Sequence, residues 1–115
     1  MPTRYVKVTP EEEITVVEVN DFYDIQQHLD GGFTSVPVVE DAVIPEGSTV
    51  FVNDEGLLLG FDRNFLAERI TGYHGRLVGT ALIAGPVDDY GETLSISKEN
   101  EDAILTFSRM SAVEA

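Results

Sequence analysis

The sequence predicts an α+β fold, a single domain with a mainly antiparallel sheet of about five or six strands, two longer helices and one short helix. Three observations support it. Short runs of β-branched and aromatic residues recur along the 115-residue chain and favour strands. Other segments place apolar residues at helical spacing. The length fits one domain, and no repeat or linker divides residues 1–115.

Three strands are expected in the first third of the chain. Arg4–Val8 and Ile14–Val19 are rich in β-branched residues and are predicted to pair as a hairpin across the turn at Thr9-Pro10. Phe33–Val39 is predicted to be a third strand. Pro37 places it at an edge of the sheet or ends it early, because proline cannot donate a ladder hydrogen bond.

A helix is predicted between these strands, at about Asp21–Asp30. Its apolar residues fall on one face: Phe22, Ile25 and Leu29. Asn20 or Asp21 is expected to cap its start, since short polar side chains accept from the first free amides. Gly31-Gly32 is expected to end it, since glycine accepts the left-handed conformation.

The chain is predicted to be organised around a central hairpin at Ser48–Gly60. Val50–Val52 is typical of a strand. Asn53–Gly56 has turn chemistry, because Asn and Asp bond their own backbone and glycine accepts a positive φ. Leu57–Leu59 is interpreted as the returning strand.

The C-terminal half is expected to hold a short helix, a buried strand and a last helix. Asn64 can cap the short helix, which ends near Thr71. Arg76–Ala84 is nearly all apolar, which predicts a central strand buried on both faces, with Gly79 at a bulge or packed closely under a helix. Lys98–Met110, capped by Ser97, is the last helix, and the residues after it are expected to fray. The two longer helices are predicted to cover one sheet face.

The chain is strongly acidic, with 21 acidic and 7 basic residues and a net charge of −14. This charge disfavours binding to nucleic acid and to anionic membranes. It leaves two interpretations, solubility or recognition of a basic protein surface. The chain has no cysteine, no membrane-length apolar run and no signal-peptide pattern, so a cytoplasmic location is expected.

No motif for catalysis, metal or cofactor is found. His28 and His74 lie far apart in the sequence and have no flanking motif. The acidic stretch Asp88–Glu92 does not have the spacing of an EF-hand loop. Gly72–Gly75 lacks the Lys-Ser/Thr of a phosphate-binding loop. We therefore predict a protein that is not an enzyme and that needs no cofactor.

Two sets of residues are candidate binding sites. The first surrounds the only segment that is not acidic and suits an anionic ligand such as a nucleotide: Asn53, Arg63, Asn64, Tyr73, His74 and Arg76. Its structural alternative is that the arginines neutralise carboxylates and the asparagines serve turns and caps. The second is an acidic surface for a protein partner: Glu11, Glu12, Glu13, Asp21, Asp24, Glu40, Asp41, Asp88 and Asp89.

Three blocks of the sequence resemble a known family. They are Leu29–Thr34, then Val52–Gly60 with Arg63-Asn64, and Val78–Gly85 leading to Leu94-Ser95. The chain resembles, over about Val19–Phe107, the family of small proteins catalogued as domain of unknown function thirty-eight forty-six. The family occurs widely in phages and in bacteria, particularly actinobacteria. Phe61-Asp62 stands where that family usually has Leu-Pro. The resemblance implies a phage or mobile-element accessory protein in a bacterial cytoplasm, and it carries no catalytic motif.

These observations leave three hypotheses. The favoured one is a module that binds a host protein, possible forms being an inhibitor or a DNA mimic whose carboxylates form one row. The second is a small-ligand or nucleotide module, which requires Arg63, Arg69 or Arg76 to converge on a pocket. The third is a structural homo-oligomer that associates through a strand edge, against which Pro37 argues. Carboxylates scattered over all faces would contradict the DNA mimic.

Overall fold

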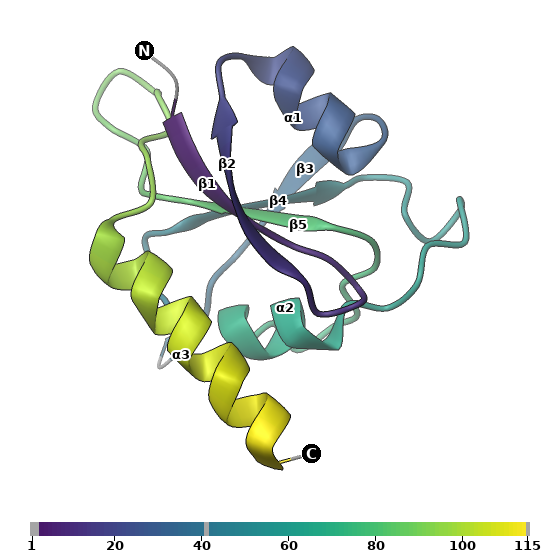
Figure 1. Ribbon diagram of the computed structural model, residues 1–115. Coiled ribbons are helices and arrows are strands. Elements are labelled where there is room, and N and C mark those ends of the chain that lie inside the picture. Colours follow the sequence, from purple (N-terminus) through teal and green to yellow (C-terminus); the bar gives the residue numbers. More distant parts are fainter. Residues whose placement is uncertain (1–2, 41, 115) are drawn as a thin grey trace.

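The computed structural model describes residues 3–40 and 42–114 and has the predicted α+β fold (Figure 1). Its five strands form one antiparallel sheet in the order β2-β1-β5-β4-β3. The strands are β1 (Thr3–Val8), β2 (Ile14–Val19), β3 (Phe33–Val36), β4 (Thr49–Asn53) and β5 (Ala81–Ala84). The helices are α1 (Phe22–Leu29), α2 (Phe65–Thr71) and α3 (Lys98–Glu114). No helix in the described part of the chain is long and apolar enough to cross a membrane.

Helices cover both faces of the sheet, so the prediction that the two longer helices share one face is wrong (Figure 1). Helix α1 packs on a cluster that includes Tyr5, Leu82 and Ala84. Helices α2 and α3 pack on the opposite cluster, which includes Val6 and Ile83. Because strand side chains alternate between faces and all four residues of β5 are buried, both faces require a cover.

The N-terminal half follows the predicted order of elements. β1 and β2 form the hairpin, and β3 ends at Val36, directly before Pro37, at an edge of the sheet. The Asp21 side chain caps α1, accepting from the Asp24 amide at 3.0 Å. The left-handed residue that ends α1 is Asp30, with φ of 61°, rather than a glycine. Phe22 lies outside the core with 74% of its surface exposed, in contrast to the prediction.

The central hairpin at Ser48–Gly60 is not present. Only Thr49–Asn53 is a strand, and Leu57–Leu59 lies in a hydrogen-bonded turn. β4 already pairs with β3 on one side and β5 on the other, so the sheet has no edge left beside it. The leucine run therefore cannot pair with the strand that precedes it.

The C-terminal half keeps its elements but shifts their limits. Asn64 caps α2, and Ser97 Oγ accepts from the Asn100 amide at 3.1 Å before α3. β5 is central, as predicted, but it covers only Ala81–Ala84 of the predicted strand. Gly79 packs closely against the Phe61 ring. Helix α3 continues beyond Met110 to Glu114, where fraying was expected.

Candidate functional site

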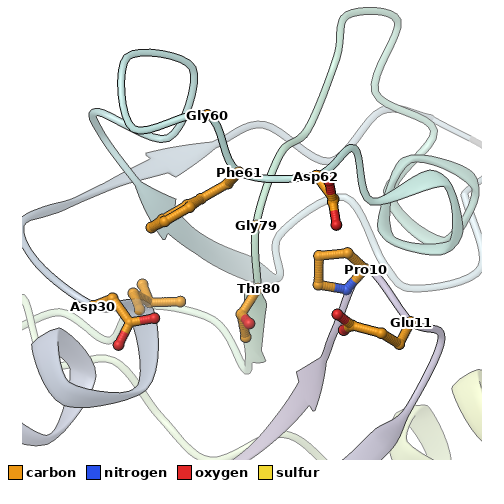
Figure 2. A pocket seen from close by; sticks show the side chains of 9 residues that line it. Pro10, Glu11, Asp30, Gly60, Phe61, Asp62, Gly79 and Thr80 are labelled. Carbon is orange, nitrogen blue, oxygen red and sulfur yellow. The ribbon is translucent and has the colours of Figure 1, made fainter.

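An open acidic cleft of about 300 Å³ lies at the end of the sheet where the β1–β2 turn, the end of α1 and the loop after β4 come together (Figure 2). Its lining consists of Pro10, Glu11, Leu29, Asp30, Gly60, Phe61, Asp62, Gly79 and Thr80. The three carboxylates come from three separate segments. Figure 2 shows Glu11 and Asp62 beside Pro10 on one side, Asp30 on the other, and Thr80 between them.

Local backbone structure places the residues that carry two of these carboxylates. The turn that carries Glu11 is closed by the Glu12 amide, which donates to the Thr9 carbonyl at 2.9 Å. Asp30 is held by its left-handed backbone, which directs the chain away from α1. The buried side-chain amide of Asn53 donates to the Leu29 carbonyl at 2.8 Å and so ties the end of α1 to the end of β4.

Phe61 and Asp62 are held by the segment that leads into β5. The Gly79 amide donates to the Asp62 carbonyl at 2.8 Å. Gly79 has φ of +77°, and a Cβ there would lie 2.7 Å from the Phe61 ring. Only glycine therefore combines this backbone conformation with this close contact. The pairing fixes the side of the cleft that carries the aromatic ring.

Asn64 joins the cleft to the core. Its side-chain amide donates to the Val8 and Gly79 carbonyls, both at 2.9 Å, and its oxygen accepts from the Ala67 amide at 3.0 Å. The residue is fully buried. One side chain therefore fixes the end of β1, the start of α2 and the segment beneath Phe61.

The chemistry of the cleft favours a cation. It is lined by three carboxylates and by no basic side chain. Across residues 3–40 and 42–114, no three acidic or histidine side chains come close enough together to hold a metal ion. A larger organic cation, such as a guanidinium or an ammonium group, can instead contact separate carboxylates and the Phe61 ring.

Three of the six predicted ligand-binding residues are engaged in hydrogen bonds or ion pairs with other residues of the chain. Asn53 binds the Leu29 carbonyl and accepts from the Glu55 amide, and Asn64 is occupied as described. Arg63 forms a bidentate pair with Glu68, with both N–O distances 2.8 Å, and lies 4.4 Å over the Phe65 ring centroid. This hydrogen bond from Arg63 lowers the pKa of Glu68, and the Leu77 amide adds to the effect.

The other three residues lie in the segment between α2 and β5. Tyr73 is partly buried against the core, His74 is exposed, and Arg76 is exposed beside a groove of about 400 Å³ that Tyr73 also lines. Arg69 pairs with Glu12 at 3.5 Å. Within the described residues, the three arginines do not converge on one pocket. The six predicted residues therefore do not form a single anion site.

The predicted acidic surface is divided among separate parts of the molecule. Glu11, Glu12 and Glu13 occupy the β1–β2 turn, whereas Asp21 and Asp24 lie at the other end of β2. Asp88 accepts from the amides of its own turn, which also carries Asp89. Glu40 is exposed in the loop after β3, and Asp41 lies outside the described residues. These carboxylates do not form one row, so the DNA-mimic form of the hypothesis is not supported.

Sequence reasoning missed Asp30, Phe61 and Asp62 as site residues. The sequence pattern predicts only that Asp30 lies at the end of a helix, and it assigns no role to Phe61-Asp62 beyond the family comparison. One signal was available, because Phe61-Asp62 replaces the Leu-Pro pair that is usual in the family the chain resembles. The structure places this departure in the cleft.

Comparison with known proteins gives one result. A family model described as "Domain of unknown function (DUF3846)" matches residues 3–110. The chain belongs to this family. The DUF3846 match includes β1 and β2 and therefore begins before the predicted span, and it covers every segment that lines the cleft. No curated protein and no solved structure matches the chain.

Proposed function

We propose that this DUF3846 protein is a non-enzymatic binding module that attaches to a basic surface of another protein. If the chain is encoded by a phage accessory gene, that partner is a protein of the bacterial host. The acidic cleft carries the proposal. Glu11, Asp30 and Asp62 line it together with the Phe61 ring, and among the described residues no basic side chain belongs to this lining. Such a site attracts the lysine or arginine side chains of a partner, and the overall charge of −14 accelerates the encounter.

The contacts of the arginines support this function over nucleotide binding. Arg63 is committed to Glu68 and Arg69 to Glu12. Arg76 is the remaining cation of that segment, and the groove beside it also carries Asp54 and Glu55. A phosphate would therefore meet two carboxylates for one guanidinium.

The test neutralises the cleft without changing its shape. Immobilised wild-type protein and the variant E11Q/D30N/D62N are incubated with bacterial lysate in about 0.1 M salt and then eluted in about 1 M salt, which screens surface charges. The wild type is expected to retain a basic protein and release it in high salt. The cleft variant is expected to retain it at least about tenfold less, since three charged contacts are lost.

The control removes the same charge elsewhere. E40Q/E46Q/D89N neutralises exposed carboxylates outside the cleft and should retain the partner as the wild type does. Equal losses in both triple variants would show that only net charge matters, and the cleft would be excluded as the site. If the wild type retains no basic protein, the proposed function is wrong.

A further inference from the structure

The loop after β4 exposes three consecutive large apolar side chains. Leu57, Leu58 and Leu59 have 70%, 87% and 53% of their surfaces exposed. A single exposed leucine is ordinary, but a contiguous apolar patch on a soluble protein is typical of an interaction surface. We call these three residues the leucine turn.

The leucine turn is fixed by its own backbone. The Gly56 amide donates to the Asn53 carbonyl, the Leu59 amide to the Glu55 carbonyl at 2.9 Å, and the Phe61 amide to the Gly56 carbonyl at 3.0 Å. Gly56 is buried, and a Cβ there would lie 2.7 Å from Val78. The leucines are therefore presented by an ordered turn, and binding need not pay to order it.

The leucine turn also borders two hollows of the surface. Leu57 and Leu58 line the groove of about 400 Å³, whose other walls include Val36, Val52 and Tyr73. The residues that directly follow the turn, Gly60–Asp62, line the acidic cleft. One loop thus joins an apolar groove to a site for cations.

The charges around the leucine turn identify the kind of partner that fits it. Asp54 and Glu55 precede the turn and are exposed, and Asp62 follows it. Arg76 is the one basic residue in the lining of the same groove, so the carboxylates outnumber it. A second copy of this chain would place the same carboxylates opposite these, and the two chains, each with a net charge of −14, would repel each other. A partner with basic residues beside its apolar side chains meets complementary charge instead.

We propose that the leucine turn is the apolar centre of the partner-binding surface and that its occupant is an amphipathic segment of another protein, with aliphatic side chains flanked by lysine or arginine. The aliphatic side chains cover Leu57 and Leu58 and enter the groove, and the basic residues reach the acidic cleft. This inference rests on the proposed function and names the class of segment that the module recognises.

The test uses two synthetic helical peptides with identical lysines, one with leucines on its apolar face and one with glutamines in their place. Fluorescence anisotropy measures their affinities for the full chain. Wild-type protein is expected to bind the leucine peptide at least about tenfold more tightly, since burial of two leucines is worth more than that factor. In L57Q/L58Q this preference should disappear, with weak, salt-sensitive binding of both peptides retained.

The matched control is V87Q/L94Q, which replaces two exposed apolar residues outside the loop and should keep the preference. Unchanged thermal unfolding midpoints show that both variants fold. Equal affinity of wild type for the two peptides, or an unchanged preference in L57Q/L58Q, overturns the inference, and E11Q/D30N/D62N still tests the proposed function separately. Two other results would also overturn it. One is a wild-type protein that is a dimer in solution and becomes a monomer in L57Q/L58Q. The other is binding of neutral phosphatidylcholine vesicles by the wild type and not by L57Q/L58Q.

Discussion

Asn64 shows how one polar side chain can organise both the core and the site. It has no exposed surface, and each of its polar atoms has a backbone partner. A buried amide is tolerated only when it is fully bonded, and it then specifies one arrangement of its partners. Here the arrangement joins β1, α2 and the glycine beneath Phe61.

Replacement of Asn64 by alanine is expected to lower the free energy of unfolding by about 2–4 kcal/mol, because three hydrogen bonds are lost and their backbone partners stay buried. Urea denaturation measures the change. Asn20→Ala, at an exposed position, should alter it by less than about 0.5 kcal/mol. A loss below about 1 kcal/mol for Asn64→Ala would contradict the organising role.

The Glu68 carboxylate predicts a pH dependence of stability. Its pKa is lowered in the folded chain by the hydrogen bond from Arg63, so the unfolded chain binds the proton more readily. The stabilisation is present above the unfolded pKa of about 4.3 and is lost as the pH falls through the lower folded pKa. Glu68→Gln should therefore cost about 1 kcal/mol at neutral pH and less in acid.

Urea denaturation at about pH 7 and about pH 3 checks the Glu68 prediction. Glu46→Gln, an exposed carboxylate in the loop before β4, serves as the control and should follow the wild type at both values. An equal cost of Glu68→Gln at the two pH values would mean that its ionised form is not what stabilises the fold.

At the scale of elements, the segment after β4 shows how neighbouring strands override a local pattern. Leu57–Leu59 has the composition of a returning strand and follows good turn residues. Both edges of β4 are nevertheless taken by β3 and β5, which are remote in sequence. The leucines are therefore left exposed on the surface.

Helix α1 shows the opposite case, in which local signals are sufficient. Asp21 caps it, and Ile25 and Leu29 of the predicted apolar face are buried, whereas Phe22 of that face is exposed. Its end differs only in that Asp30 adopts the left-handed conformation, which aspartate accepts more readily than most residues. That difference places the Asp30 carboxylate at the cleft.

At the scale of the whole molecule, charge repulsion opposes compactness. With 21 acidic and 7 basic residues, most carboxylates have no opposite charge to pair with. The Cα radius of gyration is 13.1 Å, which is well below the Debye length of about 30 Å at 0.01 M salt. Carboxylates on separate elements therefore repel one another through much of the fold when the salt concentration is low.

Salt is consequently expected to stabilise the protein. Raising sodium chloride from about 0.01 M to about 1 M should add about 1 kcal/mol, or about 4–8 °C in Tm. Thermal unfolding followed by circular dichroism measures the shift. E40Q/E46Q/D89N should show a smaller rise, because it carries less charge. A Tm that falls with salt would mean that the ion pairs outweigh the repulsion.

The sequence by itself determined the fold class, the order of most elements and several caps, because strand composition, helical spacing and capping side chains act over a few residues. It also determined the acidic charge and the family. The sequence is also compatible with roles of Asn53 in a turn and Asn64 in a helix cap, and the hydrogen bonds of both side chains agree with these roles.

Only the tertiary structure decided which residues meet. The distribution of helices over both sheet faces, the absence of the central hairpin and the placement of Glu11, Asp30 and Asp62 along one cleft all depend on contacts between segments distant in sequence. Local propensity carries no information on such contacts, because they are set by competition for strand edges and by the burial of whole faces.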